Sequence, residues 1–99
     1  MSDAAPPVVG GGRTGVDPPT PPRVVLYGRP GCHLCDDALA VVLEVRARCP
    51  FALTQVDIES DDGLLERYLE RIPVLCIDGR ERFELFVAAG ALEAALRRA

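Results

Sequence analysis

VVLYGRPGCHLCDDALAVVLEV, residues 24–45, joins an apolar run to an amphipathic one through a turn and two cysteines. The run that ends at Tyr27 is continuous, rich in β-branched residues and bounded by Gly28, which is typical of a strand buried on both faces. From Cys32 to about Arg48, apolar residues recur at three- and four-residue steps, which predicts a helix. The stretch therefore predicts a strand, a turn and a helix, with both cysteines at the start of the helix.

The rest of the chain extends this alternation of strands and helices. Strands are predicted at residues 51–58, 74–77 and 82–86, a second helix is predicted after a cap at Ser60, Asp61 or Asp62, and a last helix is predicted at 88–98. Because crossover connections are right-handed, we expect the first three strands to run parallel. Asp78-Gly79 predicts a hairpin that makes the fourth strand antiparallel. The order βαβαββα predicts an α/β fold with a four-stranded mixed sheet and helices on both faces.

Residues 1–22 differ in composition from the rest of the chain. They contain six prolines and four glycines, and few large apolar side chains. Such a segment cannot bury enough surface to offset the entropy that it would lose on ordering. We therefore predict a disordered tail over residues 1–22 and one folded domain over residues 23–99.

The charge and the hydropathy of the chain argue against several classes of function. The net charge is -4, which disfavours nucleic acid and anionic membranes as partners. The sequence has no run of about 18 apolar residues that could span a bilayer, and its N-terminus has no basic segment followed by an apolar one. We expect a cytoplasmic protein, in which reducing conditions favour catalytic, metal-bound or inert cysteines over structural disulfides.

Cys32 and Cys35 have a spacing that suits thiol–disulfide chemistry. At a helix N-terminus, free backbone N–H groups and the helix dipole favour a thiolate over a thiol. We predict that Cys32 attacks a substrate disulfide, and that Cys35, one turn further along, releases the product. Arg29 should favour the thiolate and Asp36 should oppose it, so we expect a moderately lowered pKa for Cys32. His33 could tune the pair when protonated, or simply face solvent.

A metal site is the main alternative use of these thiols. A structural zinc site needs four ligands, usually as two close pairs. Cys76 lies in a predicted buried strand, where we expect a small core residue. Cys49 lies at the far end of the predicted helix, about 25 Å from Cys32, and we expect it to be a partly exposed free thiol. An iron–sulfur cluster that takes Cys32 from each of two chains remains open.

Ile72-Pro73 is the second feature of the sequence that indicates a functional site. Proline is tolerated at the start of a strand because it has no N–H to donate, and a cis bond in a tight local geometry is the other interpretation. This loop should lie opposite the end of the first strand, close to Cys32. An exposed backbone edge at Ile72, Pro73 and Val74 could pair there with an extended substrate.

With these residues in view, the chain resembles the thioredoxin-fold superfamily, and within it the small glutaredoxin-like proteins. VVLYGRPGCHLCDDA is similar to the first strand and active-site helix of that group, and VDIESDDGLLERYLERIPVLCIDG is similar to its second helix and cis-proline strand. The resemblance implies a thioredoxin-like fold. It also implies that Cys32 is the nucleophile, Cys35 the resolving thiol and Pro73 the cis-proline.

Other positions depart from the pattern of these families. His33-Leu34 stands between the cysteines, where thioredoxins carry Gly-Pro and glutaredoxins usually carry Pro-Tyr. Leu26 stands where thioredoxins carry a buried acid. Among the glutathione contacts of glutaredoxins, Arg29 and Ile72-Pro73-Val74 match two, whereas residues 86–91 lack the Gly-Gly-x-x-Asp segment.

Together these features predict a thiol–disulfide oxidoreductase with a two-cysteine mechanism. Cys32 and Cys35 are the expected catalytic residues, and Arg29, His33 and residues 72–74 are expected to bind substrate. We expect a monomer without a bound metal or cofactor, which acts on a protein disulfide or a low-molecular-weight disulfide and takes electrons from an external thiol or a reductase. The alternatives are a carrier module that holds a metal or an iron–sulfur cluster, and an interaction domain whose thiols are incidental.

Overall fold

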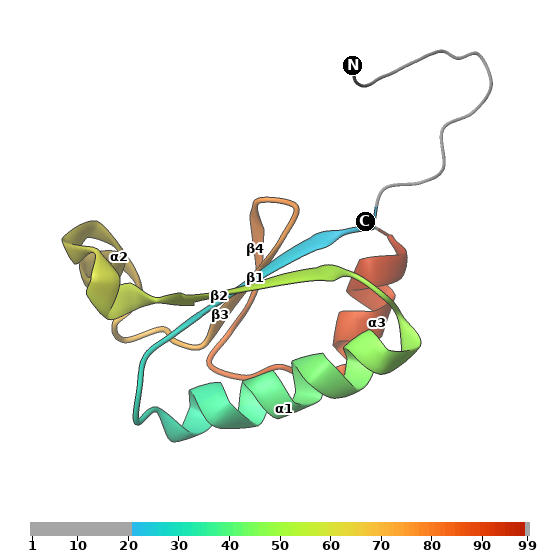
Figure 1. Cartoon of the computed structure of the whole chain (residues 1–99), viewed down its shortest axis with the longest axis horizontal. Helices are drawn as coiled ribbons and strands as arrows, with labels where there is room; N and C mark the ends of the chain where they lie inside the picture. The colour runs from blue at the N-terminus through green and yellow to red at the C-terminus, as the bar shows by residue number, and fades with distance from the viewer. Residues whose placement is uncertain (1–20, 99) are drawn as a thin grey trace, which may run out of the picture.

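The computed structural model describes residues 21–98, which form one mixed sheet with helices around it (Figure 1). In chain order the elements are β1 (Arg23–Gly28), α1 (His33–Arg48), β2 (Ala52–Asp57), the 3-10 helix η1 (Ile58–Ser60), α2 (Asp62–Tyr68), β3 (Val74–Ile77), β4 (Arg80–Glu84) and α3 (Ala89–Arg97). The predicted order of strands and helices is confirmed, with η1 as an addition. The disordered tail predicted over residues 1–22 lies outside the described residues, apart from its last two positions.

Short-range chemistry explains where the helices begin and end. At α2, the Asp61 carboxylate accepts a hydrogen bond from the Leu64 N–H at 3.0 Å, so Asp61 is the cap among the three candidates. At the end of α1, Cys49 has left the helical backbone conformation, with φ -129° and ψ 92°. A proline disfavours helical backbone angles at the residue before it, so Pro50 accounts for the end of α1.

The hairpin between β3 and β4 is tighter than the sequence pattern predicts. Asp78 and Gly79 both have positive φ, 50° and 85°, as a two-residue turn of type I′ requires. The fourth strand therefore starts at Arg80, two residues earlier than predicted. It also stops two residues earlier, at Glu84, because Leu85 has a φ of 68° and leaves the extended conformation.

The direction of β3 corrects the prediction from the sequence. The strand order is β2-β1-β3-β4, and β1 and β2 are parallel, but β3 is antiparallel to β1 as well as to β4. β2 ends beside the end of β1, and α2 stays at that end of the sheet (Figure 1). α2 has seven residues and is only about 10 Å long, too short to return the chain to the opposite end. The chain therefore enters β3 at Val74 beside Tyr27, near the end of β1.

Alternate residues of the central strands fill a core on each face of the sheet. Val24 and Leu26 of β1 pack with α1 and α3 on one face. Val25 and Tyr27 pack on the other face with η1 and α2, in a cluster that includes Ile58 and Tyr68. The helices therefore cover both faces of the sheet, as predicted.

Charged side chains tie α2 to the β3–β4 hairpin. Arg71 donates a hydrogen bond to Glu84 at 2.8 Å and another to Glu81. The Tyr68 hydroxyl donates to Glu81 at 3.1 Å, and Arg67 lies 3.9 Å from the same carboxylate. The hydrogen bond from Arg71 is the main cause that lowers the pKa of the Glu81 carboxyl. Burial, and then the hydrogen bond to Glu81, raise the pKa of Tyr68.

Replacing Glu81 with Gln should weaken the dependence of stability on pH. A carboxyl whose pKa falls on folding stabilises the native state at pH values above its unfolded pKa of about 4.3, and this contribution disappears as the pH drops through the folded value. The effect should be small because exposed ion pairs are weak. Urea unfolding should show wild type more stable than Glu81→Gln at neutral pH and equal to it in acid. Glu66→Gln, a substitution at an exposed position of α2, is the control. A difference in stability between wild type and Glu81→Gln that persists in acid would contradict the lowered pKa of Glu81.

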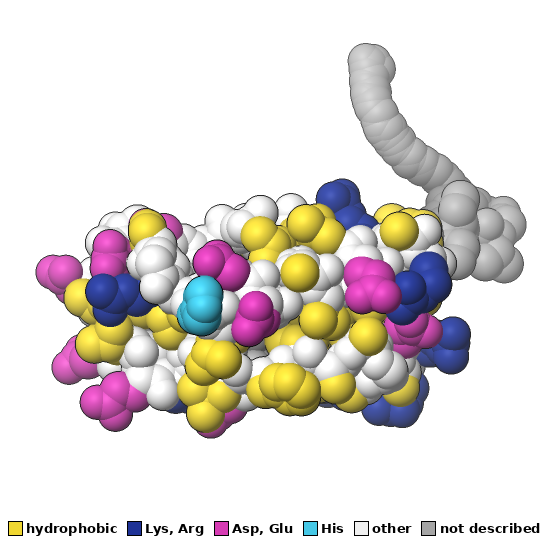
Figure 2. Space-filling view, turned by 90° about the horizontal axis from the view of Figure 1, so that it is seen from below, with side chains coloured by type: hydrophobic (Ala, Val, Ile, Leu, Met, Phe, Trp, Pro, Cys, Tyr) yellow, Lys and Arg dark blue, Asp and Glu magenta, His cyan; other side chains and the backbone are white. Residues whose placement is uncertain are grey.

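The face that α1 covers carries both hydrophobic and acidic side chains (Figure 2). His33, Asp36 and Asp37 are exposed residues of α1. The composition of this face matters for the site, because α1 begins at the cysteine pair.

None of the helices between residues 21 and 98 is both long enough and apolar enough to cross a bilayer.

Candidate functional site: the Cys32–Cys35 pair

Cys32 caps the N-terminus of α1 with its sulfur. It has an extended backbone, with φ -90° and ψ 109°, and its Sγ accepts a hydrogen bond from the Cys35 N–H at 3.1 Å. Serine, threonine and aspartate usually take this place and satisfy a free N–H of the first turn. Here the free N–H group and the positive end of the helix dipole point at a sulfur atom, where they stabilise a negative charge.

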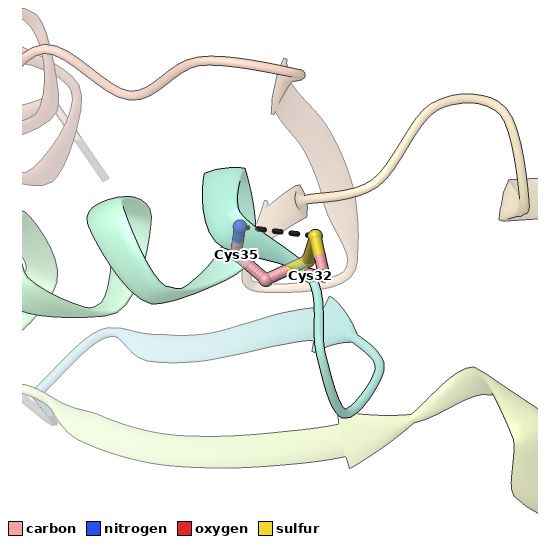
Figure 3. The surroundings of a disulfide bond; sticks show 2 residues. All are labelled: Cys32 and Cys35. Atoms are coloured by element: carbon pink, nitrogen blue, oxygen red, sulfur yellow. Dashed lines mark hydrogen bonds between the residues drawn. A yellow bond between two sulfur atoms is a disulfide. The ribbon is translucent and has the colours of Figure 1, made fainter.

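The second cysteine lies within bonding distance of the first. Cys32 and Cys35 form a disulfide, and their Cα atoms are 5.2 Å apart (Figure 3). This separation is within the usual range for a disulfide, about 4.4–6.8 Å. Cys32 is partly exposed, whereas only 8% of Cys35 is exposed. An incoming substrate can therefore reach Cys32 more easily than Cys35.

Gly28, the last residue of β1, lets the strand approach the second cysteine. A Cβ atom at this position would lie 3.0 Å from the Cys35 Sγ and 3.2 Å from its Cβ. Both distances are shorter than ordinary van der Waals contact, about 3.5–4.0 Å between carbon atoms. The sequence marked Gly28 only as the end of a strand, and its contact with Cys35 depends on how α1 packs against β1.

Arg29 lies at the same site but already has a partner. Its guanidinium is 3.2 Å from the Glu59 carboxylate of η1, and both side chains are exposed. Arg29 also lines a cleft of about 300 Å³ between the ends of β1 and β2 and the first turns of α1, and Cys35 and Asp36 form part of the same wall. The structure thus brings Arg29 close to the cysteine pair. The nearby carboxylates of Glu59 and Asp36 offset its positive charge.

Residues 72–74 lie close to the cysteine pair. Ile72 and Val74 belong to the same buried cluster as Cys35, and Cys32 packs against that cluster. The Ile72-Pro73 peptide bond is cis. The Ile72 N–H donates to the Tyr68 carbonyl at 3.0 Å, and the Pro73 carbonyl accepts from Leu85 at 2.8 Å. These two backbone groups are therefore engaged within the chain, and pairing with a substrate at this loop stays a prediction.

The remaining predicted positions have the expected surroundings. His33 is exposed in the first turn of α1, and its role toward a substrate stays a prediction. Cys49 is a free, partly exposed thiol, and Cys76 is free and buried, as predicted. Burial is the main cause that raises the pKa of the Cys76 thiol, and the charge of Glu81 adds to it. Cys76 is thus a buried core residue.

The part of the chain that the structure describes contains no group of three or more His, Cys, Asp or Glu side chains that could hold a metal ion. Cys49 lies at the end of α1 opposite to Cys32 and Cys35, as the helix length predicts. Cys76 is buried on the α2 face of the sheet. Within the described residues, neither Cys49 nor Cys76 is grouped with the pair as a further metal ligand.

The model of one protein family, the glutaredoxin-like domain (DUF836), matches residues 23–97. The chain belongs to this family. The match includes every described helix and strand together with both cysteines of the pair. No curated protein sequence is significantly similar to the chain.

Solved structures place this glutaredoxin-like domain among thioredoxin folds. Protein XcR50 from X. campestris is 36% identical, covering 77% of this chain and 97% of its own, with a TM-score of 0.67. Protein Ne2328 from Nitrosomonas europaea is 28% identical, and the match covers 83% of this chain and 99% of that protein, with a TM-score of 0.70. A mutant thioredoxin from Halobacterium salinarum shares the fold. It is 18% identical, and the match covers 80% of this chain and 74% of that protein, with a TM-score of 0.62. The predicted resemblance and fold class are confirmed.

Proposed function

We propose that this glutaredoxin-like domain is a thiol–disulfide oxidoreductase that uses Cys32 and Cys35 as a dithiol. The observation that carries the proposal is the position of the Cys32 sulfur at the N-cap of α1, where it accepts the Cys35 N–H at 3.1 Å. This position stabilises a thiolate, and the thiolate is the form of cysteine that attacks disulfides. The disulfide with Cys35 supplies the other half of the reaction.

The reaction begins from the reduced pair. The Cys32 thiolate attacks one sulfur of a substrate disulfide, the substrate S–S bond breaks, and the second substrate sulfur leaves as a thiolate that takes up a proton. Cys32 is then joined to the first substrate sulfur. Cys35 loses its proton and attacks the Cys32 sulfur, which forms the Cys32–Cys35 disulfide and releases the second reduced thiol. Two electrons pass from the protein to the substrate.

The substrate and the electron donor follow from the same chemistry. The substrate is a protein disulfide or a low-molecular-weight disulfide, and an external thiol or a reductase returns two electrons to the Cys32–Cys35 disulfide. The protein acts as a monomer in a reducing compartment such as the cytoplasm, where such a donor is present. The chemistry uses only sulfur atoms of the chain and of its reaction partners.

The proposal is tested by reduction of hydroxyethyl disulfide with dithiothreitol as the donor. Wild-type protein should accelerate the reaction in proportion to its concentration, and the same sample should contain no stoichiometric metal by elemental analysis. A rate equal to that of dithiothreitol alone would refute the proposal. Zinc or iron at one atom per chain or per two chains, together with such a rate, would support a carrier module instead.

A further inference from the structure

A small apolar groove lies beside the first turns of α1. It has a volume of about 80 Å³ and runs between α1, which contributes Leu34, Ala38 and Val41, and the loop after β4, which contributes Leu85 and Phe86. Phe86 is 72% exposed and Leu34 is 49% exposed, although both are large apolar side chains. The volume equals that of only two or three liquid waters, so the groove suits one short aliphatic side chain and not a whole small-molecule ligand.

The loop that carries Phe86 is held in place by the backbone. Leu85 has a φ of 68°, which is rare for a residue with a side chain and costs energy. Its N–H points at two carbonyls, those of Arg71 at 3.1 Å and Pro73 at 2.8 Å. These contacts fix the loop to the segment before β3, so the exposure of Phe86 is a fixed feature of the fold.

The groove begins close to the cysteine pair along the chain, although neither cysteine lines it. Leu34 lies between the two cysteines in the chain, and Val41 is seven residues further along α1, about 10 Å away. An extended peptide advances about 3.3 Å per residue. A side chain in the groove would therefore belong to a residue no more than about three positions from the cysteine that Cys32 attacks.

The charges near the dithiol disfavour an anionic substrate. Arg29 is the cationic side chain of the turn before Cys32, and it is matched by Glu59 at 3.2 Å. Asp36 and Asp37 are exposed in the first turns of α1, and Asp37 lines the groove. Neither takes part in an ion pair among the described residues. Figure 2 shows the same face, with acidic side chains between hydrophobic ones.

We infer that the groove between Leu34 and Phe86 receives an aliphatic side chain of a partner protein, from an extended neutral or basic segment next to the disulfide that is reduced. The inference rests on the function proposed for the dithiol and specifies its substrate class. Two features support it: Leu34, which stands between the cysteines in the chain, lines the groove, and the acidic side chains of Asp36 and Asp37 would repel the carboxylates of glutathione disulfide. The bond exchange is the one described for the dithiol, and an external thiol supplies the electrons.

The test compares three disulfides with dithiothreitol as the donor. Two are cystine-linked peptides that end in one lysine, with either leucine or serine at the three positions on each side of the cysteine, and the third is glutathione disulfide. Wild-type kcat/KM for the leucine peptide should exceed that for the serine peptide about fivefold or more, the order expected when one aliphatic side chain leaves water. Glutathione disulfide should be the poorest of the three.

Phe86→Ser should reduce the preference for leucine over serine to nearly one, without changing the rate with hydroxyethyl disulfide, which is too small to fill the groove. Leu43→Ser is the matched control, because Leu43 is 48% exposed on α1 but does not line the groove. Equal rates for the two peptides, or a preference that survives Phe86→Ser, would overturn the inference and leave the dithiol function intact. Failure to reduce hydroxyethyl disulfide would overturn both.

Discussion

The Cys32→Ser protein should lose at least about a thousandfold of the disulfide-reducing activity of the wild type. Removing an attacking nucleophile costs more than removing any group that only assists it, and losses of about a millionfold are known for such residues. Here the N-cap position gives the Cys32 sulfur both its exposure and its hydrogen bond from the Cys35 N–H. A serine hydroxyl would satisfy the same N–H and preserve the cap, so the fold should be unchanged.

Cys49→Ser is the matched control for this experiment. Like Cys32, Cys49 is partly exposed and lies at one end of α1, but it is a free thiol at the C-terminal end, and its N–H donates to the Val45 carbonyl at 2.8 Å. Its replacement should leave the rate with hydroxyethyl disulfide within about twofold of wild type. A Cys32→Ser protein that retains activity, or a Cys49→Ser protein that loses it, would place the nucleophile elsewhere.

Gly28→Ala should slow the second step of the reaction by about tenfold to a hundredfold. The new methyl group would meet the Cys35 Sγ at 3.0 Å and the Cys35 Cβ at 3.2 Å, so the first turn of α1 must move away from β1. A displacement of a reacting group by a fraction of an ångström to an ångström has effects of this order. The first step should be nearly unchanged, because Cys32 lies on the exposed side of the pair.

The two steps can be separated with dithionitrobenzoate in a Cys49→Ser background. Attack by Cys32 releases the first thionitrobenzoate anion, and attack by Cys35 on the resulting mixed disulfide releases the second. In Gly28→Ala only the second release should slow. Gly90→Ala is the control, because a Cβ at that exposed position of α3 would meet no atom within 4 Å and should slightly stabilise the helix. Equal second-step rates in the two alanine variants would show that Gly28 does not position Cys35.

Much of the fold could be predicted because its signals are local. The apolar run before Gly28 and the periodicity after Cys32 predict β1 and α1, and the Asp61 cap and Asp78-Gly79 turn depend on neighbouring residues alone. The cysteine pair could be found for the same reason, since its spacing and its place at a helix start are both local. Cys49 and Cys76 likewise have the exposure that their positions in the predicted elements imply.

The parts that could not be predicted depend on contacts between distant residues. The antiparallel direction of β3 follows from the place where the short helix α2 ends, which is the end of the sheet at which β3 must start. No sequence pattern within β3 reveals this place. Leu85 lies within the strand predicted at residues 82–86, but its N–H donates to the carbonyls of Arg71 and Pro73, its φ is positive, and Phe86 after it is exposed. The ion pair of Arg29 with Glu59 and the contact of Gly28 with Cys35 likewise appear only when α1, β1 and η1 pack together.

In the proposed reaction, Cys32 attacks and Cys35 resolves. The most direct measurement is to treat the reduced Cys35→Ser protein with a limiting amount of a disulfide peptide and to locate the trapped adduct by peptide mass mapping. Without Cys35 the mixed disulfide cannot be resolved within the chain, so it should accumulate, with the peptide on Cys32. An adduct on Cys49, or no adduct while the wild type still reduces the peptide, would contradict the account.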